Sequence, residues 1–252
     1  MPKTLLSDPL WDKLSALMQH FGRIYYKAEH RLTLEGILYH MRTGIPWREL
    51  PTEFGKWNRV FQRFNAWSKS GILHLIFKWL SRYSDTEWLF IDGTIVRAHQ
   101  HSAGAASESD EALGKSRGGR STKIHLAVDS YGLPVHFELS GGQTSDIVHG
   151  EKVVQSPASD FVIADKGYDS QSFREVILKQ GAIPVIPYRK NSRKPDQRID
   201  KRLYCYRHLV ENAFARIKHF RAIATRYDKL ERNYASLIAL TFIILWLPMW
   251  AE

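Results

Sequence analysis

Hydrophobic positions follow two different spacings along the chain, and the change falls near residue 85. Up to about Ser84, apolar residues recur every three or four positions in the stretches 10–18, 32–41 and 57–67. That spacing places apolar side chains along one side of an α-helix. The sequence therefore predicts an all-helical first part.

From Trp88 onward the pattern changes to short apolar runs that are typical of strands. The predicted strands are 88–96, 122–129, 131–139, 161–165 and 182–187, and Tyr131-Gly132 suggests a hairpin between the second and the third. Helical spacing returns at 147–154, 170–180 and 201–219. Strands that come first as a group and then alternate with helices predict a mixed α/β sheet. The intervals 98–121 and 188–200 follow neither spacing and are expected to be irregular.

These patterns predict two domains, a helical one over residues 1–84 and one with the sheet over residues 85–252. The second ends in an apolar stretch from Tyr234 to Trp250. This stretch is slightly short for a membrane span and contains Pro248. A buried terminal helix packed against the sheet is therefore favoured over membrane insertion.

Charge and cysteine content narrow the class of partner and the compartment. The chain has a net charge of +10 and a pI near 9.6, which favours nucleic acid as partner ahead of a membrane surface. A single cysteine, Cys205, excludes an internal disulfide framework and a cysteine-based zinc site. Residues 1–8 lack the features of a signal peptide. We expect a cytoplasmic protein without a membrane partner.

The helix predicted over 57–67 is amphipathic and basic. It follows a turn, and its polar side carries Arg59 and Arg63 together with neighbouring lysines. A helix, a turn and a basic helix are typical of a helix-turn-helix DNA reader. The alternative is a plain helical bundle whose basic side only meets water; DNA contact is favoured.

Two aspartates stand at the ends of buried strands. Asp92 follows the apolar run LFI, and Asp165 follows FVIA. A carboxylate next to a buried strand is costly unless it is paired or bound to a metal ion, and open α/β sheets place their sites at strand ends. Taken alone, both aspartates could equally be turn caps.

A third carboxylate, Glu211, lies in the long helix predicted over 201–219. Tyr204, Arg207 and Lys218 are spaced to share its side of that helix. Three carboxylates can hold two divalent cations for phosphodiester chemistry, and oxygen ligands of this kind suit Mg²⁺ or Mn²⁺. Arg207 and Lys218 can hold phosphate oxygens. Together these residues predict a phosphodiester-processing site.

The same residues resemble a known family. The pattern of Tyr204, Arg207, Glu211 and Lys218 resembles the C-terminal signature of DDE transposases of bacterial insertion sequences, in the IS-five family of the IS four/five superfamily. The segments IDGTIVRAHQHSAGA, GKSRGGRSTKIHLAVD, IADKGYDS, HLVENAFARIKHFRAIATRYDK and WRELPTEFGKWNRVFQRFNAWSKSG also resemble that family.

The resemblance implies a ribonuclease-H-like catalytic core with Asp92, Asp165 and Glu211 as a DDE triad that binds two Mg²⁺ or Mn²⁺ ions. It implies binding and cleavage at the terminal inverted repeats of the element, and joining of the 3′-hydroxyl to target DNA. A bacterial, nucleoid-associated setting and a homo-oligomer in the active complex are further expectations.

A glycine-rich basic segment, GKSRGGRS, precedes the second predicted strand. It nearly matches a phosphate-cradling nucleotide-binding loop, but Arg120 replaces the required lysine and a strand follows where a helix should begin. The favoured interpretation is a basic loop that contacts the DNA backbone through Arg117, Arg120 and Lys123.

Two other function classes remain as alternatives to a transposase. A helix-turn-helix regulator would need no triad, whereas all three acids are present beside basic residues. A metal-dependent nuclease of the same fold without strand transfer would use the same ions and the same first step. The sequence favours the transposase.

Overall fold

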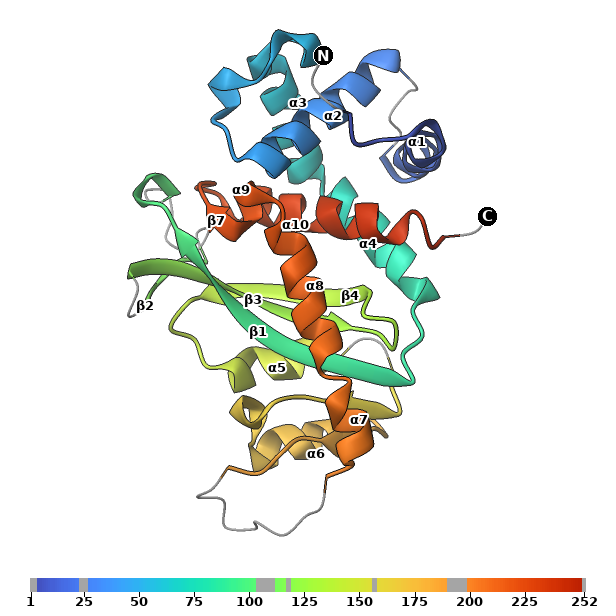
Figure 1. Cartoon of the computed structure of the whole chain (residues 1–252), viewed down its shortest axis with the longest axis vertical. Helices are drawn as coiled ribbons and strands as arrows, with labels where there is room; N and C mark the ends of the chain where they lie inside the picture. The colour runs from blue at the N-terminus through green and yellow to red at the C-terminus, as the bar shows by residue number, and fades with distance from the viewer. Residues whose placement is uncertain are drawn as a thin grey trace. The chain divides into compact units, whose positions relative to one another are not determined.

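The computed structural model describes residues 4–22, 27–102, 112–116, 119–155, 158–189 and 199–250. Two compact units make up the chain (Figure 1). The helical unit contains residues 1–80, 98–111 and 217–252, and the sheet unit contains residues 81–97 and 112–216. The end of the chain thus belongs to the same compact unit as its beginning, whereas the predicted functional division near residue 84 stays a prediction.

The helical unit begins with the four helices α1 (Asp8–Gly22), α2 (Ala28–Thr43), α3 (Trp57–Ser70) and α4 (Ile72–Leu80). Two short 3₁₀ helices, η1 (Trp47–Glu49) and η2 (Thr52–Phe54), join α2 to α3. Helix α2 ends at Gly44, whose left-handed φ of 69° suits a residue without a side chain. The predicted all-helical first part is confirmed.

The apolar C-terminal stretch forms α10 (Glu231–Trp246), which packs against α3 and α4. Phe242 contacts Phe77 with ring centroids 5.1 Å apart, and the hydroxyl of Ser236 donates to that of Ser68 at 3.0 Å. The expectation that this helix packs against the sheet is wrong, because its partners are helices. Within the described residues, no helix has the length and apolar character needed to cross a membrane.

The sheet unit is built on β1 (Trp88–Ala98), β2 (Gly114–Ser116), β3 (Gly119–Val128), β4 (Pro134–Gly141), β5 (Phe161–Ile163) and β6 (Ile183–Val185). Strand β1 is central: it pairs antiparallel with β3 and parallel with β5. Beyond them, β4 pairs antiparallel with β3, and β6 pairs parallel with β5. This mixed sheet confirms the predicted ribonuclease-H-like α/β class. Strand β2 falls in an interval that was expected to be irregular.

Side chains alternate between the two faces of β1, and this alternation positions the site. Leu89 and Ile91 point into the core formed with α5 (Asp146–Val154) and α6 (Gln171–Lys179). Asp92 belongs to the alternate set, so its side chain leaves from the opposite face. Figure 1 shows α8 (His208–Lys218) crossing β1 on this side.

The long helix predicted over 201–219 is interrupted. Helix α7 (Lys201–Cys205) ends before a turn at Tyr206 and Arg207, and α8 follows. At the junction, backbone N–H groups donate to carbonyls three residues earlier, as from Arg207 to Tyr204 at 3.1 Å. A helix wound this way turns more per residue than an α-helix. Tyr204 therefore does not keep the angular position that a continuous helix would give it.

Candidate active site

Asp92 lies in the middle of the long strand β1, half-buried and partly fixed by its own backbone. Its Oδ1 accepts a hydrogen bond from the N–H of Gly93 at 2.7 Å. Gly93 points toward the opposite face of the sheet, where a Cβ would lie 2.4 Å from Oδ1 of Asp146. Only glycine fits there without movement of a neighbour.

Asp165 is brought beside Asp92 by the parallel pairing of β1 with β5. Phe90 pairs with Ile163, and each aspartate follows two residues later. Asp165 precedes the 3₁₀ helix η6 (Lys166–Tyr168), and its Oδ1 accepts from the N–H of Gly167 at 2.7 Å. The expectation that Asp92 ends a strand is wrong, because β1 continues to Ala98; the register of β1 with β5 still sets the two acids side by side.

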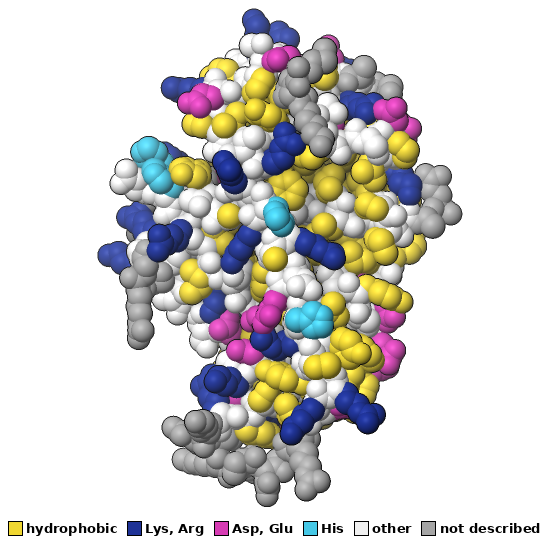
Figure 2. Space-filling model, in the orientation of Figure 1, with side chains coloured by type: hydrophobic (Ala, Val, Ile, Leu, Met, Phe, Trp, Pro, Cys, Tyr) yellow, Lys and Arg dark blue, Asp and Glu magenta, His cyan; other side chains and the backbone are white. Residues whose placement is uncertain are grey.

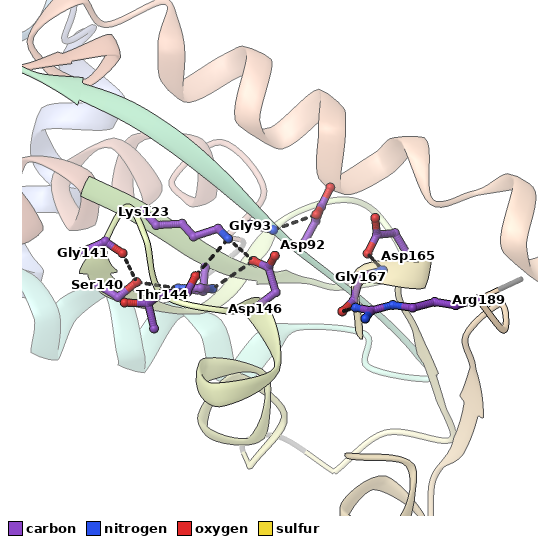
Figure 3. Close-up of polar contacts among 11 residues, drawn as sticks. Asp92, Gly93, Lys123, Ser140, Gly141, Thr144, Asp146, Asp165, Gly167 and Arg189 are labelled. Carbon is purple, nitrogen blue, oxygen red and sulfur yellow. Dashed lines mark hydrogen bonds and ion pairs between the residues drawn. The ribbon is translucent and has the colours of Figure 1, made fainter. Parts of the chain in front are cut away.

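Arg189 holds the loop that follows Asp165 (Figure 3). Its guanidinium donates to the carbonyl of Lys166 at 2.9 Å and to that of Gly167 at 2.7 Å. The N–H of Arg189 donates to Asp169 at 2.7 Å. These three bonds fix the backbone on which Asp165 sits. Arg189 lies in an interval expected to be irregular, where no spacing signals such a role.

Arg207 connects the third carboxylate to the first. Its guanidinium donates to Oδ2 of Asp92 at 3.2 Å and also bonds to Oε1 of Glu211 one helical turn further on. Glu211 is exposed, whereas Asp92 is half-buried. Within the described residues, no three His, Cys, Asp or Glu side chains lie close enough to form a metal-holding group. Arg207 lies between Asp92 and Glu211, two of the predicted metal ligands.

Burial and the neighbouring charges shift the pKa of Asp92. Burial raises the pKa of Asp92 to about 6, and the negative charges of Asp165 and Asp146 act in the same direction. The Gly93 N–H and Arg207 oppose this shift. For Arg207, burial works to lower the pKa, but the carboxylates of Glu211 and Asp92 outweigh burial and raise it. The site therefore concentrates negative charge, which a cation would relieve.

A second polar cluster lies on the α5 side of the sheet. Asp146 at the start of α5 forms a 2.7 Å ion pair with Lys123 of β3, and Figure 3 shows the pair beside Gly93. His125 stacks on His149 at 4.6 Å, and burial lowers the pKa of both rings. An aspartate at the start of a helix is typical of an ordinary cap, and nothing in the local sequence signals the pairing of Asp146 across to β3.

The other predicted site residues lie in several places. Tyr204 is on α7 and half-buried, and Lys218 is the last residue of α8. Arg120 is exposed on β3, whereas Lys123 is buried and ion-paired, so contact of Lys123 with phosphate would require that pair to open. Arg117 lies outside the described residues. The DNA-contact roles of these residues stay predictions.

The helical unit carries a basic groove between α2 and α3, where the sequence predicts a helix-turn-helix. Arg59 and Arg63 are exposed on α3, one turn apart. With Lys56 they line a groove of about 630 Å³ between α2 and α3. The structure thus places the predicted basic residues on one open surface. On the face shown in Figure 2, acidic side chains lie over both units, and basic side chains lie beside a small acidic group over the sheet unit.

The sheet unit thus belongs to the mixed α/β class and carries two strand aspartates and a helix glutamate around one arginine. Residues 83–247 match the family described as "Transposase DDE domain". The chain belongs to this family of DDE transposases, whose members generally use divalent metal ions. Residues 6–77 match the description "Putative transposase of IS4/5 family". The resemblance stated from the sequence is confirmed.

Curated relatives agree with this assignment. The chain is 33% identical to a transposase assigned to insertion sequence element IS6501 of Brucella ovis over 131 residues, which are 50% of this chain and 98% of that protein. It is 33% identical to an uncharacterized protein of Sinorhizobium fredii over 127 residues, 50% of this chain and 95% of that protein.

Two solved structures show weaker likeness. The first is a piggyBac transposase synaptic complex with hairpin DNA, with a TM-score of 0.42, 12% identity and coverage of 68% of this chain and 44% of the other. The second is a pre-cleavage Mos1 transpososome, with a TM-score of 0.27, 10% identity and coverage of 96% and 88%. Because both TM-scores are low, the assignment rests on the sheet order and the family match.

Proposed function

We propose that Asp92, Asp165 and Glu211 form the DDE triad of this transposase and hold two Mg²⁺ or Mn²⁺ ions. The observation that carries the proposal is the position of Arg207. It bonds to Asp92 and Glu211, while the strand register sets Asp165 beside Asp92. A single cationic group thus links the first and third acids.

The donor set suits these ions. All three side chains offer carboxylate oxygens, which Mg²⁺ and Mn²⁺ prefer; burial raises the pKa of Asp92 to about 6, and the charges of Asp165 and Asp146 add to that shift. Arg207 must leave the space between Asp92 and Glu211 for all three to act together. We propose that DNA phosphate draws Arg207 away, because guanidinium groups bind phosphate oxygens with two parallel hydrogen bonds.

The surrounding residues prepare the site for strand cleavage. When bound, the ions activate the attacking oxygen and stabilise the leaving oxygen of the phosphodiester. The N–H groups of Gly93 and Gly167 orient one oxygen of each aspartate and leave the other oxygen available. Arg189 keeps the Asp165 loop in place. Arg207 and Lys218 then hold phosphate oxygens of the strand.

We propose that the helical unit binds the terminal inverted repeats of the element through the groove lined by Lys56, Arg59 and Arg63. Strand cleavage would release a 3′-hydroxyl, which the same site joins to target DNA. Assembly of more than one copy on the DNA ends and a cytoplasmic, nucleoid-associated setting are part of this proposal. Sizing of the protein with and without end DNA tests the assembly.

The test is cleavage and joining of DNA that carries the terminal repeats, with Mg²⁺ or Mn²⁺ added. Asp92→Asn, Asp165→Asn and Glu211→Gln should each lower cleavage about a thousand-fold or more, equivalent to ~4 kcal/mol, while DNA binding stays. Asp160→Asn, at an exposed carboxylate before β5, is the matched control and should cleave normally.

Undiminished cleavage by any triad variant would overturn the triad. Cleavage without joining to a target plasmid would favour the alternative of a nuclease of the same fold. Binding of the repeats without any metal-dependent cleavage would favour the helix-turn-helix regulator.

A further inference from the structure

A second cleft in the helical unit is lined by aromatic side chains. It has a volume of about 770 Å³, within the range of pockets that hold small organic ligands. Its rings are contributed by η1 and α3 and by the segment after α9 (Arg221–Ala224), and they include Trp47, Trp57, Phe61 and Tyr227. This cleft shares no lining residue with the basic groove and includes none of the three acids of the candidate active site.

One wall of the cleft is a stack of flat rings. Trp47 lies on His40 with ring centroids 3.9 Å apart and planes 21° from parallel. Its ring also stacks with that of Phe64 at 5.4 Å. Burial lowers the pKa of His40 to about 4, and its Nδ1 lies 2.7 Å from the carbonyl of Ile45. This wall is therefore rigid, and His40 is uncharged at neutral pH.

Two aromatic residues of the cleft remain accessible. Tyr227 is 48% exposed although it stacks on His99 at 4.7 Å, and Trp57 is 37% exposed. Aromatic rings stack on other flat rings in offset arrangements, and both side chains leave part of their surface open to such a contact. Both therefore offer surface for a flat ligand to stack on.

The charges along the cleft are mainly positive. The guanidinium of Arg48 lies 5.8 Å from the ring centre of Trp57, and exposed Lys229 is the other cation. The lining includes one carboxylate, Asp228, whose pKa burial raises to about 6. Aromatic rings beside cations form the combination that binds bases and phosphates of unpaired nucleic-acid strands.

We propose that this cleft, lined by Trp47, Trp57 and Tyr227, receives an unstacked nucleobase of the DNA, with Arg48 and Lys229 beside its phosphates. The proposal rests on the proposed function in that DNA is the substrate. A flat apolar ligand with an attached anion fits both the stacked rings and the two cations. An uncharged apolar peptide would use the rings alone and leave the cations without a role.

Two labelled single strands of equal length, about eight nucleotides each, separate base stacking from phosphate attraction. One carries thymine at every position, and the other has the same backbone with abasic residues. We expect the full chain to bind the thymine strand roughly ten-fold more tightly, because each stacked base adds to affinity. Competition by an uncharged apolar peptide tests the other occupant.

Substitutions then locate the stacking surface. Tyr227→Ala and Trp57→Ala should each remove most of the preference for the thymine strand and leave abasic binding nearly unchanged. Tyr227→Phe should retain the preference, and Lys229→Gln should weaken both strands alike. Tyr131→Ala, at an exposed tyrosine of the sheet unit, is the matched control. Thermal unfolding of each variant verifies folding. If Trp57→Ala does not fold, Tyr227→Ala still tests the proposal, because the Tyr227 side chain is exposed.

Equal binding of the two strands by the unaltered chain would overturn the cleft proposal, as would equal losses on both strands in Tyr227→Ala. If these variants lost binding of the apolar peptide but kept binding of the thymine strand, the proposal would also be overturned. Each of these results leaves cleavage of the terminal repeats intact and so spares the proposed function. Failure to bind either strand or the repeats would overturn both.

Discussion

The acidic site of the sheet unit and the aromatic and basic surfaces of the helical unit are built in opposite ways. Asp92 and Asp165 are each held by a backbone N–H at 2.7 Å, and Arg207 joins Asp92 to Glu211. Arg59 and Arg63 instead extend into solvent from α3. Reacting groups need fixed positions, whereas long exposed side chains can adapt to a DNA backbone.

This contrast separates two kinds of defect. A change among the fixed acids should reduce the chemical step and leave DNA binding nearly intact. A change on the helical surface should weaken binding and leave the chemistry of bound DNA intact. Substitutions in each region should therefore affect either the chemical step or DNA binding, and the largest effects are expected at the fixed acids.

Outside the triad itself, Gly93→Ala should produce the largest defect. The added methyl group would lie 2.4 Å from Oδ1 of Asp146 and 3.2 Å from Cε of Lys123, so the side chains of this ion pair must shift. Overpacking of this kind costs ~1–3 kcal/mol of stability. Any part of the strain that β1 takes up would displace Asp92, and a displacement of about 1 Å can lower catalysis about a hundred-fold.

Cleavage of pre-bound DNA and chemical unfolding measure the two effects of Gly93→Ala. Ile95→Ala is the control, since this side chain lies two residues along on the same strand and is 48% exposed. Full activity with unchanged stability in Gly93→Ala would show that the sheet unit is less rigid than its contacts imply.

The sequence indicated that Asp92 and Asp165 would lie near each other, and the role of both aspartates stays a prediction. A buried run that leads into a carboxylate ends a strand only at Asp165, because β1 continues to Ala98; the parallel pairing of Phe90 with Ile163 is what aligns Asp92 with Asp165. The pairing of Lys123 with Asp146 could not be predicted, because the two are distant in sequence and Asp146 has the features of an ordinary helix cap.

The helix break before Arg207 and the partners of α10 were also hidden from the sequence. Over a few residues, spacings of three and four fit both an α-helix and the tighter winding at Tyr206 and Arg207. Helix α10 is apolar on nearly every side, which predicts burial but does not say whether a sheet or helices cover it.

Arg207→Gln should have the second largest effect. It should strengthen Mn²⁺ binding and weaken DNA cleavage. The guanidinium between Asp92 and Glu211 repels cations in the absence of DNA, so its removal should tighten Mn²⁺ binding measured by calorimetry. Cleavage should fall about ten- to hundred-fold, because a phosphate-holding group is lost. Arg216→Gln, at an exposed position of the same helix, is the control. Unchanged Mn²⁺ affinity would contradict the metal site.

Two buried titratable groups, Asp129 and His40, should contribute to stability with opposite dependence on pH. Burial raises the pKa of Asp129 in the sheet unit from 3.8 to about 6, so between these values the folded chain binds more protons, and stability falls as pH rises. Burial lowers the pKa of His40 in the helical unit from 6.5 to about 4, so in that window the unfolded chain binds more protons, and stability falls as pH drops.

Urea unfolding between pH 4 and 7 separates the two contributions, each at most ~3 kcal/mol. Asp129→Asn keeps the acceptor for the N–H groups of Tyr131 and Leu133 and should remove the loss of stability at rising pH. His40→Phe keeps a ring against Trp47 and should remove the loss at falling pH. Identical pH profiles for the variants and the unaltered chain would contradict these assignments.

The smallest expected effects belong to the exposed cations of α3. Arg59→Gln and Arg63→Gln should each weaken binding of duplex DNA several-fold and reduce the salt slope by about one, because each removes one phosphate contact. Lys69→Gln is the matched control, since Lys69 is exposed on the same helix but does not line the groove. Fluorescence anisotropy at several salt concentrations measures the slope. Cleavage of DNA at saturating concentration should stay normal in both arginine variants; a loss there would mean that α3 contributes to chemistry and would remove the separation between the two regions.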